Sequence, residues 1–337
     1  MTALLPVGKL PADHLNRLLA RHRRHDPRLV VGPQVGEDAA VIDMGDRYLV
    51  AKTDPITFAT DEIGRYVVNV NANDIACAGA TPRWFLATLL LPAGRTEVAL
   101  VDAIFAQIAE ACDALGIALA GGHTEITHGL DRPIVVGQML GETTRADYVC
   151  TSGVQPGDDI LLTKGIAIEA TALIAREKEA DLAGVAPPDY LARCRNFLHD
   201  PGISVVRDSQ LAQAGGRVHA MHDPTEGGLA TGLWEMATAA GVGLSVELAA
   251  IPVFPETRRL CAHFGLDPLG VIASGALLIA CPPDDTAGIV RQLTANSIPV
   301  AVIGRATEPA AGCTLITPTG TQPLPTFARD EIARLFE

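Results

Sequence analysis

The spacing of hydrophobic residues predicts alternating helices and strands along the chain. The clearest helix spans residues 96–115, where apolar residues recur every three or four positions and Gly116 follows as a stop signal. The same spacing predicts helices over residues 15–22, 62–78, 168–176, 205–214, 228–240 and 284–296. Short apolar runs predict strands over residues 48–53, 84–91, 117–120, 134–140, 159–163, 244–248, 275–281 and 300–303, and segment 180–188 is expected to be a loop. This mixture favours an α/β (α+β) fold.

Length and composition favour two domains. The chain has 337 residues, of which 48% are hydrophobic and only 4% aromatic, so small aliphatic side chains must form most of the core. A polar stretch rich in small residues at 142–159 is the expected junction. We therefore expect an N-terminal domain over residues 1–150, a C-terminal domain over 151–320 and a helix or tail over 321–337.

Charge and cysteine usage disfavour several classes of protein. A net charge of −13 disfavours binding to nucleic acid, and the short basic run at 21–24 is expected to be a solvated helix end. The seven cysteines form no C-x-x-C pair, which disfavours a zinc site or a disulfide framework. Residues 1–10 lack the apolar core of a signal peptide, and the apolar run near 84–92 is too short to cross a membrane. We expect a cytoplasmic protein with no membrane or nucleic-acid partner.

The segment at 222–230, HDPTEGGLA, has the composition of a phosphate–metal site at the start of a helix. Glycines such as Gly227 and Gly228 let backbone N–H groups approach phosphate oxygens, and a helix N-terminus favours negative charge. The carboxylate of Asp223 would repel phosphate unless a hard cation such as Mg²⁺ lay between them. A capped turn is the alternative, because the same residue types are common there.

Further acids and amides lie close to glycines or to the ends of predicted strands. They include Asp38, Asp54 and Glu125. Asn71 and Asp74 are three residues apart and therefore share one face of a predicted helix. They either belong to a buried hydrogen-bond network or coordinate a metal or phosphate. Several hard oxygen ligands without a His–Cys cluster favour Mg²⁺ over zinc or copper.

Three basic residues are candidates for catalysis or phosphate binding. His123 follows Gly121 and Gly122 and is either a hydrogen-bonding loop residue or a catalytic base. Lys52 and Lys164 are candidates to bind phosphate. The chain has no G-x-x-x-x-G-K-[ST], no G-x-G-x-x-G after a strand and no G-x-S-x-G, so a P-loop, a dinucleotide fold and a nucleophile elbow have no support.

Six ordered motifs carry a resemblance to a known superfamily. They are GEDAAV, KTD, NVNANDIACAGATPRW, GGHTEI, LLTKG and HDPTEGGLA, between about Gly36 and Arg305. The set resembles the aminoimidazole ribonucleotide (AIR) synthase-related, or PurM-like, superfamily, which includes thiamine-monophosphate kinase, selenophosphate synthetase and the hydrogenase maturation factor HypE. HDPTEGGLA and the stretch from Ile251 to Leu269 look most like HypE.

The resemblance implies a PurM-like two-domain fold, a homodimer formed through the N-terminal domain and ATP bound between the domains through Mg²⁺. It implies a set of metal and phosphate ligands, to which Glu125 is added as a replacement ligand: Asp38, Asp54, Asp74 and Glu125. It implies a set of nucleotide-binding residues: Asn71, Gly121, Gly122, Thr124, Thr225, Gly227 and Gly228. The strand 85–91 is apolar on both faces and also favours a dimer.

Two departures from the HypE pattern affect the expected reaction. HypE factors carry a terminal cysteine, whereas the last cysteine here is Cys313, in a strand-like run. HypE's own reaction is therefore not expected in cis, and the thiol of Cys313 is expected to be buried and inert. His123 also stands where the resemblance would place Asp, so either one metal ligand is missing or Glu125 replaces it.

The leading hypothesis is an ATP- and Mg²⁺-dependent, HypE-like enzyme. It would activate an oxygen or a carbonyl of a small-molecule or protein-bound substrate by phosphoryl transfer. His123, Lys52 and Asp223 are the candidate catalytic residues, and Lys164 joins the nucleotide-binding set. The alternative is a nucleotide-binding accessory protein in metalloenzyme maturation that has no free substrate. Turnover of ATP that depends on a small molecule would separate the two.

Overall fold

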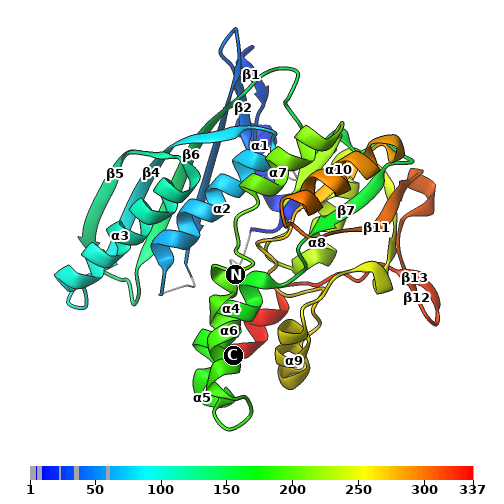
Figure 1. Ribbon diagram of the computed structural model, residues 1–337. Helices are drawn as coiled ribbons and strands as arrows, with labels where there is room; N and C mark the ends of the chain where they lie inside the picture. Colours follow the sequence, from blue (N-terminus) through cyan, green and yellow to red (C-terminus); the bar gives the residue numbers. More distant parts are fainter. Residues whose placement is uncertain (1–4, 6–9, 23, 34–37, 58–60, 337) are drawn as a thin grey trace, which may run out of the picture.

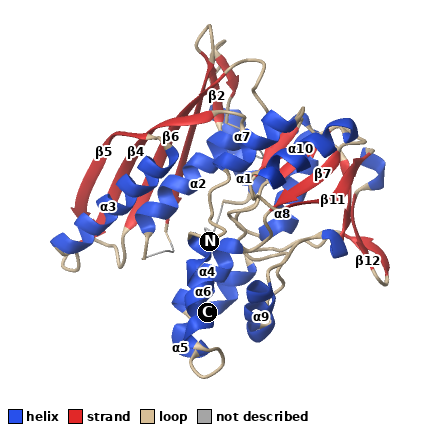
Figure 2. Cartoon of the chain, in the orientation of Figure 1, coloured by secondary structure: helices blue, strands red, loops and turns tan. Residues whose placement is uncertain are grey.

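The computed structural model describes residues 5, 10–22, 24–33, 38–57 and 61–336 and contains two β-sheets with helices packed on them (Figures 1 and 2). Gly36 and Glu37 of the first motif, Arg23 of the basic run and most of residues 1–10 lie outside the described residues. The predictions made for those positions are therefore not addressed. No helix of the described chain combines the length and hydropathy that a membrane span requires.

The first sheet has six strands in the order β1-β2-β3-β6-β4-β5. The strands are β1 (Leu29–Val31), β2 (Ala40–Asp43), β3 (Tyr48–Ile56), β4 (Thr81–Pro92), β5 (Ala118–Thr127) and β6 (Ile134–Thr143). Among the described pairs of this sheet, β4 and β5 are parallel and the others antiparallel. Helix α1 (Ala12–His22) precedes the sheet, and α2 (Ile63–Cys77) and α3 (Val98–Leu115) cover one of its faces (Figure 1).

The second sheet has seven strands in the order β13-β12-β9-β11-β7-β10-β8. The strands are β7 (Asp159–Thr163), β8 (Ala220–His222), β9 (Gly243–Glu247), β10 (Leu278–Cys281), β11 (Val300–Thr307), β12 (Cys313–Thr317) and β13 (Gly320–Pro323). The α-helices of this part are α4 (Ile168–Glu177), α5 (Glu179–Leu182), α6 (Pro188–Arg195), α7 (Val206–Gly215), α8 (Gly228–Ala240), α9 (Pro255–Phe264) and α10 (Pro283–Ala295). Short 3-10 turns span Thr151–Gly153, Asn196–Leu198, Leu248–Ala250, Pro309–Ala311 and Glu331–Leu335.

The two sheets differ in how their faces are covered. In the second sheet, Ile160 and Leu162 of β7 pack into the core cluster that contains α4 and α8, whereas Leu161 packs into the cluster that contains α7 and α10. Its central strands are thus buried on both faces. In the first sheet, alternate residues of β4 such as Phe85 and Leu89 pack under α2 and α3, while no helix of the described residues covers the opposite face of the sheet (Figure 1).

Most predicted elements are confirmed, and the deviations affect the interpretation of the site. Helices 62–78, 96–115 and 228–240 and strand 159–163 match the observed elements within two residues. Strand 48–53 instead continues to Ile56, so Asp54 lies inside β3, and strand 117–120 continues to Thr127. The predicted loop at 180–188 contains most of α5 and the start of α6. The sheets are largely antiparallel, so the acids do not share one carboxyl edge.

Candidate functional site

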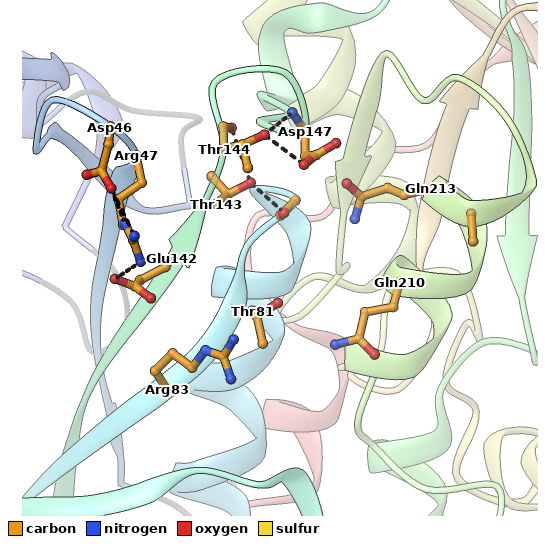
Figure 3. Close-up of a pocket in the computed structure, with 12 residues that line it drawn as sticks. Asp46, Arg47, Thr81, Arg83, Glu142, Thr143, Thr144, Asp147, Gln210 and Gln213 are labelled. Carbon is orange, nitrogen blue, oxygen red and sulfur yellow. Dashed lines mark hydrogen bonds and ion pairs between the residues drawn. The ribbon is translucent and has the colours of Figure 1, made fainter.

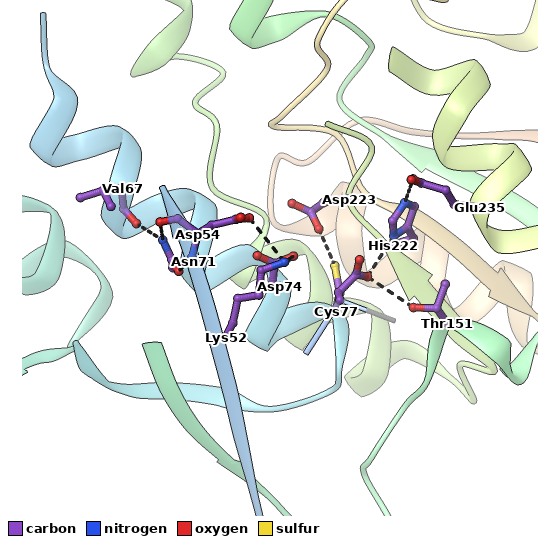
Figure 4. Close-up of polar contacts among 11 residues, drawn as sticks. Lys52, Asp54, Val67, Asn71, Asp74, Cys77, Thr151, His222, Asp223 and Glu235 are labelled. Carbon is purple, nitrogen blue, oxygen red and sulfur yellow. Dashed lines mark hydrogen bonds and ion pairs between the residues drawn. The ribbon is translucent and has the colours of Figure 1, made fainter. Parts of the chain in front are cut away.

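Three carboxylates from distant parts of the chain converge between the two sheets (Figure 4). Asp38 lies just before β2, Asp74 lies on α2, and Asp223 follows β8 directly. One carboxylate oxygen from each lies within 4.8 Å of the others, an arrangement that could hold a metal ion. We call Asp38, Asp74 and Asp223 the acid triad. Its members come from both halves of the chain, so the site depends on how the two sheets pack together.

The acid triad contains two buried carboxylate oxygens that lack hydrogen-bond partners among the described residues: Asp74 Oδ2 and Asp223 Oδ2. Burial raises the pKa of Asp74 well above its usual range. Lys52 lowers this pKa, whereas repulsion from Asp223 and Asp38 raises it further. Burial and repulsion from Asp38 raise the pKa of Asp223 to about 7. Buried unpaired acceptors are costly, and a hard cation would satisfy them with the oxygen ligands that Mg²⁺ prefers.

Lys52 supplies a positive charge beside the acid triad. It lies on β3, and its Nζ atom is 3.2 Å from Asp74 Oδ1 and 3.4 Å from Asp54 Oδ2. Burial opposes the charged form, but the surrounding carboxylates outweigh it and raise the pKa of Lys52 above its usual range. The ammonium therefore stays protonated at neutral pH beside the acid triad.

His222 is held by carboxylates on both ring nitrogens. Its Nδ1 atom is 2.9 Å from Asp38 Oδ2, and its Nε2 atom is 3.0 Å from Glu235 Oε2 on α8 (Figure 4). Burial would lower the pKa of His222, but the Asp38 and Glu235 carboxylates raise it well above the usual value. The pKa of Asp38 is lowered because the imidazolium and Lys52 outweigh its burial. His222 therefore donates both N–H groups and keeps Asp38 ionised.

Sequence analysis missed four side chains that support the acid triad. They are His222, Glu235, Cys77 and Thr151. The thiol of Cys77 donates to Asp223 Oδ1 at 3.3 Å, and the hydroxyl of Thr151 donates to Asp38 Oδ2 at 3.3 Å. His222 begins the HDPTEGGLA motif and Cys77 follows Asp74 in the NVNANDIACAGATPRW motif, so both were available as signals. Thr151 and Glu235 lie outside the six motifs, and no local pattern marks them.

Asn71 joins α2 to β3 through a buried hydrogen-bond network. Its Oδ1 atom accepts from the Asp54 backbone at 2.9 Å, and its Nδ2 atom donates to the carbonyls of Val67 and Asp54 at 2.8 and 3.2 Å. A Cβ atom at Gly137 would lie 2.3 Å from Asn71 Nδ2, so a side chain there would displace the amide. Of the two alternatives for Asn71, the described contacts are those of a structural network that positions Asp54.

The glycine loop, defined as residues 223–228, forms a tight turn before α8. Gly227 and Gly228 have φ angles of 79° and 67°, a region that disfavours other residues. The amide of Gly227 donates to Asp330 Oδ2 at 2.7 Å, and that of Gly228 donates to the Thr225 carbonyl at 3.0 Å. The backbone therefore forms the turn that was the alternative expectation for this segment. Its N-cap residue, Gly227, provides no side-chain cap for α8. In this conformation both amides donate within the protein, and their contact with phosphate stays a prediction.

The described contacts of Lys164 are with its own surroundings and not with the acid triad. Its Nζ atom is 2.7 Å from the Ser204 carbonyl and 3.4 Å from the carboxylate of Asp208, and the side chain is buried. Burial lowers the pKa of Lys164, with Asp208 opposing this effect. The ammonium thus holds the segment that leads into α7, and its predicted contact with phosphate is not visible here.

The predicted Gly-Gly-His-Thr-Glu residues occupy a different region of the molecule. They are Gly121, Gly122, His123, Thr124 and Glu125, all exposed on the edge strand β5. His123 pairs with Thr88 and Glu125 pairs with Leu90, on the face of the sheet that lies opposite α2 and α3. The register also places three strand spacings, about 14 Å, between β5 and Asp54 on β3. Within one chain, this motif does not join the acid triad.

A separate polar groove lies between the first sheet and α7 (Figure 3). It has a volume of about 600 Å³ and is lined by residues such as Arg83, Gln210 and Gln213. Its Arg47 is paired with Asp46 and Glu142. The groove contains none of the predicted site residues, so we do not assign the candidate reaction to it.

Comparison with known families matches most of the chain. The family model described as AIR synthase related protein, N-terminal domain, matches residues 36–143, and the corresponding C-terminal model matches residues 155–313. Carbamoyl dehydratase HypE of Rhodobacter capsulatus is 33% identical over 273 residues, covering 79% of this chain and 75% of the relative. Selenide, water dikinase of Dechloromonas aromatica is 29% identical over 330 residues, covering 86% and 89% of the two chains.

Solved structures share the fold. A chain of a HypE–HypF complex has a TM-score of 0.76 at 19% identity, and the match covers 94% of this chain and 100% of that chain. A structure of the hydrogenase maturation protein HypE in complex with ATP has a TM-score of 0.72 at 24% identity, covering 94% and 95% of the two chains. Together with the two matched domain models, these likenesses confirm the PurM-like two-domain fold. The chain belongs to the AIR synthase-related protein family.

Proposed function

We propose that this protein is an ATP- and Mg²⁺-dependent enzyme that activates an oxygen or a carbonyl of its substrate by phosphoryl transfer. The acid triad carries the proposal, because two of its buried carboxylate oxygens lack partners among the described residues. The relatives support the same class of reaction. They include proteins named carbamoyl dehydratase and selenide, water dikinase, and one structural neighbour was determined with ATP.

The roles of the residues follow from their contacts. Asp38, Asp74 and Asp223 would hold Mg²⁺, which supplies neutralisation of phosphate charge when bound. His222 keeps Asp38 ionised and oriented through its own proton. Lys52 places an ammonium beside the acid triad, where it would stabilise charge on the transferred phosphoryl group. Asp54 holds Lys52 in position and is a further candidate ligand.

The reaction is tested by incubating the protein with Mg-ATP and following ADP and phosphate by phosphorus NMR. We expect Mg²⁺-dependent turnover, stimulated by the correct acceptor and lost in Asp74→Asn. Asp113→Asn is the control, because Asp113 is exposed on α3, a helix that carries no member of the acid triad. A folded parent protein that binds no Mg-ATP by calorimetry would contradict the proposal. Binding without turnover would favour the accessory role in metalloenzyme maturation.

We also propose a homodimer formed through the outer face of the first sheet. This face carries apolar side chains that no helix of the described chain covers, including the 37% exposed Trp84 and the half-buried Leu86 and Leu90. His123 and Glu125 lie on the same face, so any role for them in the reaction would require a second copy of the chain. The division into domains 1–150 and 151–320 with a tail over 321–337 remains part of this proposal.

A further inference from the structure

The segment near the C-terminus, residues 324–336, packs along the second half of the molecule and reaches the glycine loop. Ile332 is buried in the main core cluster, and the ring of Phe327 would meet a Cβ atom at Gly270 within 2.6 Å. The indole of Trp234 donates to the Pro325 carbonyl at 3.2 Å. In Figure 1 the red helical turn lies beside α4 and α6. These contacts attach the segment firmly to the domain that carries Asp223.

Asp330 is the residue of this segment that contacts the glycine loop. Its Oδ2 atom accepts from the Gly227 amide at 2.7 Å, and its Oδ1 atom accepts from the Ile332 amide at 2.9 Å. One carboxylate therefore links the last helical turn to the loop. Charge-assisted hydrogen bonds of this length are among the stronger ones in proteins. The bond also satisfies an amide at the start of α8 that no side chain of that helix caps.

The neighbouring segment 265–273 receives contacts from the same part of the chain. The amide of Glu331 donates to the Gly270 carbonyl at 3.0 Å, and Glu331 Oε2 accepts from the Asp267 amide at 3.3 Å. Segment 265–273 in turn bonds the glycine loop, because the Ala273 amide donates to the Thr225 carbonyl at 3.3 Å. Residues 324–336 thus hold the loop directly through Asp330 and indirectly through segment 265–273.

We propose that Asp330 is a positioning residue of the candidate nucleotide site, which fixes the Gly227 amide and thereby the loop that carries Asp223 and Thr225. The effect of Asp330 on nucleotide binding rests on the proposed function. Its effect on the order of the glycine loop does not depend on that function. Asp330 is not a catalytic residue, because its carboxylate contacts backbone amides and not the acid triad. Asp330 lies outside all six of the sequence motifs described above.

The first test measures the loop without nucleotide. We would compare the parent with Asp330→Ala, Asp330→Asn and Glu308→Gln by amide hydrogen exchange over residues 224–232. Exchange at Gly227 should rise about tenfold or more in the alanine variant and less in the asparagine variant, which keeps one acceptor oxygen. Glu308→Gln is the matched control, because Glu308 is exposed after β11 and its side chain has no described contact with the glycine loop or with segment 265–273. Unchanged exchange at Gly227 in the folded alanine variant would overturn the proposal.

The second test measures binding of Mg-ADP by calorimetry and turnover of Mg-ATP. The dissociation constant of Asp330→Ala should rise about tenfold, with KM for Mg-ATP affected more than kcat, and the control should match the parent. Tighter binding by the alanine variant would also overturn the proposal, because Asp330 would then compete with the ligand for the Gly227 amide. A parent protein that binds no Mg-ADP would count against the proposed function, whereas the exchange experiment would still decide the role of Asp330.

Discussion

The acid triad and the Gly-Gly-His-Thr-Glu motif on β5 have similar signals in the sequence but different surroundings in the fold. Both contain acids close to glycines beside a predicted strand. Asp74 and Asp223 are buried and have strongly raised pKa values, whereas His123 and Glu125 are exposed on an edge strand and contact each other at 3.6 Å. Closeness to glycine in the sequence therefore does not indicate which face of a sheet a side chain occupies.

The largest expected effect separates these two regions by mutation. Asp74→Asn should weaken Mg-ATP binding about hundredfold, because the amide keeps the shape but loses the charge that holds the cation. Glu125→Gln is the comparison variant from β5, and in the background of the monomeric variant Leu90→Asp it should leave Mg-ATP binding unchanged, because Glu125 does not join the acid triad within one chain. Calorimetry measures both. Equal affinity in the Asp74 variant and the parent would remove Asp74 from the metal site.

The metal-free protein should respond in the opposite direction. Burial raises the pKa of Asp74, so its ionised form costs stability at neutral pH when no cation is bound. Asp74→Asn should therefore melt at a higher temperature than the parent in the presence of a chelator. A lower melting temperature would show that the carboxylate has a structural role that does not require a metal.

A second experiment tests whether β5 and its neighbours form a dimer interface. Leu90→Asp places a charge on the outer face of β4 and should convert the dimer to a monomer, halving the mass measured by light scattering. Val98→Asp is the control, because Val98 is 77% exposed on α3, which packs on the other face. A parent protein that is monomeric at all concentrations would refute the dimer.

A third experiment follows the pH dependence of stability at Glu169, which lies at the start of α4. Burial raises the pKa of Glu169 to about 8 from a usual value of 4.5, with repulsion from Glu226, Asp330 and Asp223 adding to it and a hydrogen bond from Ser274 opposing it. The folded state therefore keeps the proton while the unfolded chain loses it. Stability should fall as pH rises from about 4.5 to about 8 and then level off.

Glu169→Gln should remove that part of the slope. A tenfold difference in proton affinity corresponds to about 1.4 kcal/mol, so the gain at pH 8.5 should be no more than about 5 kcal/mol and should vanish near pH 4.5. Urea unfolding at several pH values measures it. A constant difference between variant and parent across this range would show that Glu169 does not titrate with folding.

The smallest effect is expected at a position outside both regions. Cys313 is buried on β12, and burial raises the pKa of its thiol. Cys313→Ser should lower the melting temperature by a few degrees, because a hydroxyl is more costly to bury, and should leave ATP turnover unchanged. Loss of turnover in a variant that remains folded would indicate a reactive role for this cysteine.

The sequence predicted local elements better than it predicted their contacts. Helical spacing identified α2 and α3, and the HDPTEGGLA motif identified the turn before α8, because these patterns depend on nearby residues. The strand through Gly121 and Gly122 was predicted too short, because glycine usually ends strands and here it continues one. No local pattern could link Asp38 to His222, since residues 184 positions apart meet only after both sheets have formed.

The carboxylates of the acid triad come from both halves of the chain. The peptide segment that joins the halves therefore acts as a tether, which sets the effective concentration of one set of carboxylates around the other. If the chain were cut in the polar stretch between β6 and β7, Asp38 and Asp74 would remain on one fragment and Asp223 on the other. A cation could then be shared by all three carboxylates only when the two fragments had associated. If the acid triad binds a divalent ion as proposed, reassembly of the fragments would depend on the concentration of that ion, and metal binding would be measurable as an affinity between the two halves.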